Sequence, residues 1–281
     1  MPMTVRRFVR GPRPLCVVTA YDYPSARLAD EAGMDAILVG DSVGQVVQGY
    51  PDTLSVTLDQ MIYHTAMVSR AAKEAMVIAD MPFMSYQASA EQALLSAGRL
   101  MKEARPQAVK LEGGSRVAET VLRLVEAGIP VMGHIGYTPQ SVHTLGSGRA
   151  QGRDLEAARR VLTDAIDVEA AGAFAVVLEV MPFRLAALIT SQLHIPTIGI
   201  GAGPGCSGQV LVWHDLLAMP DLGLRHSRAF AQIGEAALAG LVAYRQAVTD
   251  GSFPTEAHSV AMADEVIAQL EREVPKQAPD A

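Results

Sequence analysis

The chain has 281 residues, of which 49% are hydrophobic and 19% charged, and its formal net charge is −7. This composition predicts one large globular domain rather than a disordered chain, and the acidic balance argues against a general nucleic-acid-binding protein. The two cysteines lack metal-ligand spacing, which argues against a disulfide scaffold and a structural zinc site. The sequence also lacks an apolar run of about 20 residues, which argues against a membrane span. We therefore expect a cytoplasmic protein.

The first 14 residues form a short basic segment. Four arginines occur here before any acidic residue, and Pro12 and Pro14 interrupt the segment. An apolar run that resembles a core strand begins at Leu15. We therefore expect residues 1–14 to be a basic arm or a short helix rather than a transit peptide.

Eight short apolar runs then alternate with longer helical patterns. The predicted strands are 15–20, 36–41, 75–80, 108–113, 130–136, 174–180, 196–203 and 210–215. Helical spacing is clear in 89–104 and 154–172, and Gly33, Gly128 and Gly172 follow helical stretches as helix-ending glycines do. Apolar strands separated by helices predict a parallel sheet covered on both faces, and eight strands favour an α/β fold of the (β/α)8 TIM-barrel class. We assign residues 15–262 to this single catalytic domain and 263–281 to a helical or flexible tail.

Four of the predicted strands carry an acid at or near their carboxyl end: Asp41, Asp80, Glu112 and Glu179. Active sites of barrels lie at that edge. Lys110 shares a strand face with Glu112, because side chains two residues apart point the same way. Carboxylates that converge repel each other unless a cation or proton lies among them, and oxygen ligands suit Mg²⁺. A single strand-end acid is commonly a helix cap or a salt-bridge partner, but four together favour a site.

Two further features are open to more than one reading. His134 lies near the carboxyl end of the predicted strand 130–136 and is either a hydrogen-bond partner of the site or a plain core histidine. The glycine-rich segment 199–205 is similar to a dinucleotide-binding fingerprint, but another predicted strand follows it where that fingerprint requires a helix. We therefore interpret it as a loop at the barrel mouth.

Ten segments together resemble the ketopantoate hydroxymethyltransferase family. In order they are TAYDYPSA, LVGDSVG, VQGYPDTLSVTLDQMIYHT, ADMPFMSY, VKLEGG, GHIGYTPQS, VLEVMP, IGIGAG, GQVLVWHD and PTEAHS, and they extend from residue 19 to 259. The resemblance implies a magnesium-dependent transfer of a hydroxymethyl group from 5,10-methylenetetrahydrofolate, the co-substrate, to 3-methyl-2-oxobutanoate. It also implies a homo-oligomer, a decamer among the options, that has neither nucleic-acid nor membrane partners.

The resemblance implies roles for individual residues as well. Asp41, Asp80 and Glu112 would form the metal site, and Asp41, Ser42, Asp80 and Lys110 would bind the ketoacid. Glu179 would be the catalytic base. Three places depart from the family pattern: Arg149, Ser207 and the segment 223–230.

Two other functions compete with this assignment. A lyase or mutase of the phosphoenolpyruvate mutase/isocitrate lyase superfamily would share the barrel and a magnesium-bound 2-oxoacid. Those enzymes often carry a catalytic cysteine or acid on a mobile loop, and no comparable segment occurs here. A catalytically silent scaffold is the other alternative, but clustered acids would only destabilise an inert barrel.

Overall fold

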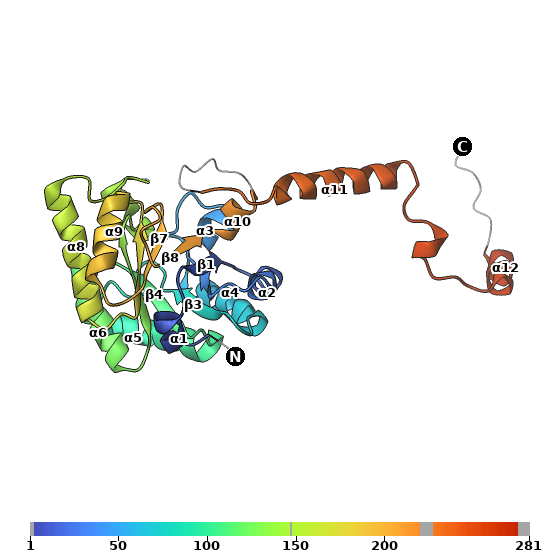
Figure 1. Cartoon of the computed structure of the whole chain (residues 1–281). Helices are drawn as coiled ribbons and strands as arrows, with labels where there is room; N and C mark the ends of the chain where they lie inside the picture. Colours follow the sequence, from blue (N-terminus) through green and yellow to red (C-terminus); the bar gives the residue numbers. More distant parts are fainter. Residues whose placement is uncertain (1–2, 147, 220–226, 275–281) are drawn as a thin grey trace. The chain divides into compact units, whose positions relative to one another are not determined.

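The computed structural model describes residues 3–146, 148–219 and 227–274. Eight parallel strands form a closed barrel in chain order (Figure 1). The strands are β1 (Leu15–Thr19), β2 (Ala36–Val39), β3 (Met76–Asp80), β4 (Ala108–Glu112), β5 (Val131–Gly136), β6 (Ala175–Glu179), β7 (Thr197–Ile200) and β8 (Gly208–Leu211). The predicted (β/α)8 class is confirmed.

Helices follow most of the strands. The α-helices of the barrel part are α1 (Val5–Arg10), α2 (Tyr23–Glu31), α3 (Val43–Val46), α4 (Leu58–Ala71), α5 (Ala90–Arg99), α6 (Ala118–Glu126), α7 (Val142–Leu145), α8 (Leu155–Ala170), α9 (Phe183–Gln192) and α10 (Trp213–Leu216). A π-helical turn η1 (Leu100–Ala104) extends α5, and 3₁₀ turns form at η2 (Ser115–Val117) and η3 (Pro139–Ser141). Gly33, Gly128 and Gly172 have φ of +79°, +82° and +95°, which confirms them as helix-ending residues.

The barrel interior is apolar at one end and charged at the other. Alternate strand residues such as Ala108, Ile78 and Val177 pack inside the barrel, together with Phe8 from α1. Phe8 is fully buried, and its ring lies edge-on to Phe174 with 5.9 Å between the centroids. The outward residues of the strands instead pack against the surrounding helices. Toward the carboxyl ends of the strands, buried charged side chains such as Asp80 and Lys110 take the place of these apolar residues.

The eighth strand differs from its predicted range of 210–215. It begins at Gly208, which pairs with Leu15 of β1, and it ends at Leu211. A Cβ atom at position 208 would lie 2.5 Å from the carbonyl oxygen of Leu15, so only glycine permits this close approach. Trp213 begins α10, and its N–H leaves the ladder and donates to Thr19 Oγ1 at 3.0 Å. The segment after β7 is a loop, as predicted, because β8 follows it directly.

The chain divides into two compact units, Met1–Ala231 and Gln232–Ala281. The first contains the barrel. The second contains α11 (Ile233–Thr249), a 3₁₀ turn η4 (Glu256–His258) and α12 (Asp264–Glu273), and neither α-helix has a buried residue. The unit boundary thus precedes α11, whereas we placed α11 with the barrel; the domain limits of 14 and 262 stay predictions. None of the described helices is both long and apolar enough to cross a membrane.

Candidate active site

A cavity of about 300 Å³ opens at the carboxyl ends of the strands. Its lining includes all seven residues that the sequence singled out: Asp41, Ser42, Asp80, Lys110, Glu112, His134 and Glu179. Most of these ionisable groups are buried; Asp41, Asp80, Lys110, Glu112 and His134 each expose 6% or less of their surface. The structure therefore brings the predicted residues together in one place.

The strand register explains why they meet. Asp80 on β3 is opposite Lys110 on β4, and Glu112 on β4 is opposite His134 on β5. Glu179 ends β6 opposite Gly136 of β5. Because neighbouring parallel strands end at the same edge, each of these side chains projects into the same end of the barrel.

Lys110 binds Asp80, the acid at the end of β3. Its Nζ lies 2.8 Å from Asp80 Oδ1, and the backbone N–H of Asp41 donates to Asp80 Oδ2 at 3.0 Å. Burial alone would lower the pKa of Lys110, but the charges of Asp80, Glu112 and Asp41 outweigh burial and hold that pKa above its ordinary value. Lys110 therefore stays a cation inside the barrel.

Asp41 and Glu112 carry more negative charge than their surroundings compensate. Burial and the neighbouring Asp80 raise the pKa of Asp41 to about 7. Burial and the charge of Asp41 also raise the pKa of Glu112 well above its usual range. Glu112 Oε1 is buried and has no hydrogen bond, although His134 Nδ1 lies 3.6 Å away. Both carboxylates would be stabilised by an additional cation.

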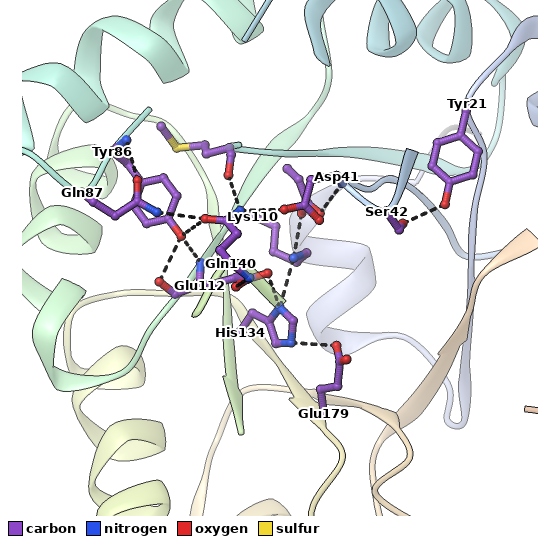
Figure 2. Close-up of polar contacts among 12 residues, drawn as sticks. Tyr21, Asp41, Ser42, Tyr86, Gln87, Lys110, Glu112, His134, Gln140 and Glu179 are labelled. Carbon is purple, nitrogen blue, oxygen red and sulfur yellow. Dashed lines mark hydrogen bonds and ion pairs between the residues drawn. The ribbon is translucent and has the colours of Figure 1, made fainter. Parts of the chain in front are cut away.

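His134 links Lys110 to Glu179 (Figure 2). Its Nδ1 lies 3.2 Å from Lys110 Nζ, and its Nε2 lies 3.0 Å from Glu179 Oε2. An ammonium group can only donate, so Nδ1 accepts and the ring hydrogen is on Nε2, facing the carboxylate of Glu179. Burial and the charge of Lys110 lower the pKa of His134 well below its ordinary value, which keeps the ring neutral. His134 thus contacts ionisable side chains of the cavity rather than the apolar core alone.

Sequence reasoning missed two residues of the site, Gln140 and Tyr86. Gln140 donates through Nε2 to Asp41 Oδ2 at 2.8 Å and accepts at Oε1 from the hydroxyl of Tyr86 at 2.7 Å. Both are buried. They belong to the segments GHIGYTPQS and ADMPFMSY, but neutral polar side chains on turns have no periodic or charge signal that marks them.

Comparisons with known proteins agree on one family. The family model described as ketopantoate hydroxymethyltransferase matches residues 3–256. The chain is 49% identical to 3-methyl-2-oxobutanoate hydroxymethyltransferase of Acetivibrio thermocellus, with 92% of each chain covered. It is 56% identical to the enzyme of the same name from Desulforapulum autotrophicum, with 87% of this chain and 92% of the relative covered. The chain belongs to the ketopantoate hydroxymethyltransferase family.

Several solved structures that share the fold carry other names. One is 2,3-dimethylmalate lyase, a phosphoenolpyruvate mutase/isocitrate lyase superfamily member, with a TM-score of 0.57, 18% identity and coverage of 96% of this chain and 98% of that one. Another is phosphonopyruvate hydrolase in complex with oxalate and Mg²⁺, with a TM-score of 0.59, 12% identity and coverage of 96% of both chains. At such low identity they establish the shared barrel only, whereas the sequence matches select the ketopantoate hydroxymethyltransferase family over the lyase alternative.

Two of the departures from the family pattern, Arg149 and Ser207, lie in the described part of the chain. Arg149 is exposed, and its carbonyl oxygen accepts from Gln151 Nε2 at 2.8 Å. Ser207 joins strands: its Oγ accepts from Thr197 N–H at 3.2 Å, and its carbonyl oxygen accepts from Leu15 N–H at 3.0 Å. Of the segment 223–230, residues 223–226 lie outside the described part of the chain. Ser207 therefore serves the β7–β8–β1 junction.

The ketopantoate hydroxymethyltransferase family resemblance implies magnesium, and the residues present can be tested for it. Within residues 3–146, 148–219 and 227–274, no three His, Cys, Asp or Glu side chains are grouped so as to hold a metal ion by themselves. Mg²⁺ does not need such a group, since it is commonly held by one or two carboxylates, waters and substrate oxygens. Asp41 and Asp80 supply two adjacent carboxylates, and Glu112 Oε1 is a buried acceptor without a donor. These oxygen donors fit Mg²⁺. The assignment of Asp41, Asp80 and Glu112 to the metal site stays a prediction.

We expect the metal-free protein to lose stability as the pH rises from 6.5 to 8. A carboxyl whose folded-state pKa is raised contributes stability that is present below its unfolded pKa, near 4, and lost as the pH passes its folded pKa, about 7 for Asp41. His134 is neutral in the folded state but half protonated at pH 6.5 in the unfolded chain, so its deprotonation adds back about 0.4 kcal/mol, which is less than the loss from the carboxyl groups. Asp41 alone should contribute a loss of about 1 kcal/mol. Thermal unfolding with a chelator present, followed across this range, measures it; a flat or rising midpoint would contradict the raised pKa.

Proposed function

We propose that this protein transfers a hydroxymethyl group from 5,10-methylenetetrahydrofolate to 3-methyl-2-oxobutanoate and forms 2-dehydropantoate. Membership of the family supports the reaction. One observation supports the site: Glu179, Asp41 and Asp80 line one cavity, and Glu179 contacts His134 there. A base on one side and charge-stabilising groups on the other are what removal of a hydrogen next to a keto group requires.

The ketoacid would bind beside Lys110 and Ser42. The ammonium of Lys110 would face the negative charge of the substrate carboxylate, which a buried cation stabilises strongly in surroundings of low dielectric. Ser42 Oγ lies 2.8 Å from the hydroxyl of Tyr21, so Tyr21 orients it at the cavity wall. Either oxygen of this pair can be the donor, which leaves the Ser42 hydroxyl able to donate to a substrate oxygen.

Asp41 and Asp80 would hold Mg²⁺, with Glu112 nearby. When bound, the ion would supply Lewis-acid stabilisation of negative charge that develops on the keto oxygen. Asp80 is already held by Lys110 and by the N–H of Asp41, so its carboxylate orientation is set before any ligand arrives. Such preorganisation avoids the cost of rearrangement during the reaction.

Glu179 would remove the hydrogen from C3 of the ketoacid. Its side chain is 17% exposed, in contrast to the buried acids, so it is open to the cavity where the substrate lies. The electron pair of the C3–H bond passes to the keto group, and C3 then bonds to the one-carbon unit of the folate. Water supplies the hydroxyl of the new hydroxymethyl group as both carbon–nitrogen bonds of the methylene carbon break, and the proton from C3 and the remaining proton of water go to the two nitrogens of the tetrahydrofolate that leaves. His134 Nε2–H would hold Glu179 toward the substrate throughout.

Proton NMR tests the function directly. Purified protein is mixed with 3-methyl-2-oxobutanoate, Mg²⁺ and 5,10-methylenetetrahydrofolate. Loss of the methine signal together with a new hydroxymethyl signal would support the transferase. A methine signal that persists unchanged, with no hydroxymethyl product, would reject it and favour the lyase or scaffold functions.

We also propose a homo-oligomer, with a decamer as the form that the family resemblance suggests. Helix α11, considered by itself, carries large apolar side chains that are exposed, among them Leu238, Leu241, Val242 and Tyr244. Apolar surface of this kind is commonly covered by another protein surface. Light scattering of the purified protein measures the assembly, and a monomer at micromolar concentration would contradict it.

A further inference from the structure

We propose that Gln140 is the positioning residue of the cation site: its neutral amide and backbone N–H fix the carboxylates of Asp41 and Glu112 in orientations that bind a divalent cation. This inference rests on the magnesium part of the proposed function. Gln140 lies on η3, the turn after β5, and 6% of its surface is exposed. From there it reaches acids that belong to two other strand ends (Figure 2).

The orientation of the Gln140 amide is determined by its partners. The nitrogen lies 3.0 Å from the carbonyl oxygen of Met81, which can only accept, so the atom facing it must be the donor Nε2. The same nitrogen lies 2.8 Å from Asp41 Oδ2. Both amide hydrogens are thus assigned, one to the backbone and one to the carboxylate. The amide cannot rotate without breaking both bonds.

The opposite end of the amide is held equally firmly. Oε1 accepts from the hydroxyl of Tyr86 at 2.7 Å and from Gln87 Nε2 at 2.9 Å. The Tyr86 hydroxyl in turn accepts from the backbone N–H of Glu112 at 3.0 Å, and 1% of Tyr86 is exposed. The network therefore closes on itself: the ring of bonds that orients Gln140 also passes through Glu112.

Gln140 also contacts Glu112 directly, through its own main chain. Its N–H donates to Glu112 Oε2 at 2.9 Å, while Glu112 Oε1 has no hydrogen bond. One oxygen of Glu112 and one of Asp41 are each fixed by Gln140. A charged donor at this position would neutralise the acids, as Lys110 does for Asp80, whereas an amide orients them and leaves their negative charge for a cation. Residues that orient ligating carboxylates in this way typically contribute 10–100-fold to metal affinity.

The test measures Mn²⁺ binding in the absence of substrates, using the electron paramagnetic resonance signal of the free ion. Gln140→Met keeps the side-chain length but removes the amide. It should weaken Mn²⁺ binding about 10–100-fold. The matched control is Gln107→Met. Gln107 Oε1 accepts from Val77 N–H at 2.7 Å near the start of β3, whereas the carboxylates of the site lie at the carboxyl ends of the strands. That variant loses a glutamine bond as well but should bind Mn²⁺ as the unaltered protein does.

A second variant guards against a general loss of structure. Tyr86→Phe keeps Gln140 and the aromatic ring but removes the hydroxyl that anchors Oε1, and we expect Mn²⁺ binding to weaken by a smaller factor, about 3–10-fold. Unchanged Mn²⁺ affinity in a folded Gln140→Met variant would overturn the inference and leave the proposed function standing. Equal weakening in Gln107→Met would also overturn it, because destabilisation alone would then explain the effect. An unaltered protein that binds no Mn²⁺ would overturn both the inference and the metal part of the proposed function.

Discussion

Replacing Glu179 with glutamine is expected to lower the rate of hydrogen removal from C3 of the ketoacid by about 10²–10⁴-fold, the usual contribution of a general base. The amide has almost the same shape as the carboxylate but cannot accept a proton. Its oxygen can still occupy the place that Glu179 Oε2 takes, 3.0 Å from His134 Nε2, so the side chain should keep its position. The loss should therefore be one of chemistry and not of binding.

Exchange of the C3 hydrogen for deuterium in heavy water, followed by proton NMR with Mg²⁺ but without folate, isolates this step. Ketoacid affinity, measured by calorimetry, should change by less than about threefold. Glu119→Gln is the matched control, since Glu119 lies exposed in the first turn of α6. Exchange in Glu179→Gln at the rate of the unaltered protein would assign the base to another residue.

Replacing Asp41 with asparagine should have opposite effects on ligand binding and on stability. It removes one of the two adjacent carboxylates proposed to hold the cation, so binding of Mn²⁺ and of the ketoacid should weaken at least about 100-fold. The metal-free protein should nevertheless become more stable at pH 8. Burial and the charge of Asp80 raise the pKa of Asp41 to about 7, so ionisation of Asp41 opposes folding above that pH. The upper limit of the gain is roughly 4 kcal/mol.

Two measurements separate these effects. Calorimetric titration with Mn²⁺ and ketoacid gives the binding loss, and thermal unfolding with a chelator at pH 6.5 and pH 8 gives the stability. The fall in stability between these two pH values should be smaller in Asp41→Asn than in the unaltered protein. Asp59→Asn is the control, because Asp59 is an exposed partner of Arg99 and should affect stability by less than about 1 kcal/mol. A destabilised variant with intact binding would contradict both the pKa and the role.

The polar interior separates the functional part of this barrel from its structural part. Toward the amino ends of the strands, residues such as Ile78 and Ala108 pack with Phe8 and stabilise the fold. Toward the carboxyl ends, the same strands continue with Asp80 and Lys110. Burial of those charges costs stability that the apolar end supplies, because isolated buried charges are unfavourable unless they are paired. Occupation of the site by a cation would remove part of that cost.

The sequence by itself determined the barrel and seven of the residues that line its cavity. Apolar runs of strand length, helix-ending glycines such as Gly128, and acids at successive strand ends are local patterns. Parallel strands of a barrel end at one edge, so Asp80, Glu112 and Glu179 had to meet there once the fold was known. The predicted strand 196–203 ran three residues past the end of β7, and β8 began two residues earlier than predicted because Gly208 allows a backbone contact with Leu15 that no local pattern indicates.

Only the tertiary structure decided how the acids are held. Gln140 and Asp41 are 99 residues apart in the chain, and the bond between them depends on where the turn after β5 lies relative to the end of β2. Lys110 Nζ donates to His134 Nδ1, so the ring hydrogen of His134 is on Nε2. A strand pattern cannot predict that Lys110 lies beside Nδ1. Hydrogen bonds are directional and short-ranged, so the partner of a neutral polar side chain depends on the folded positions of distant backbone segments rather than on sequence spacing.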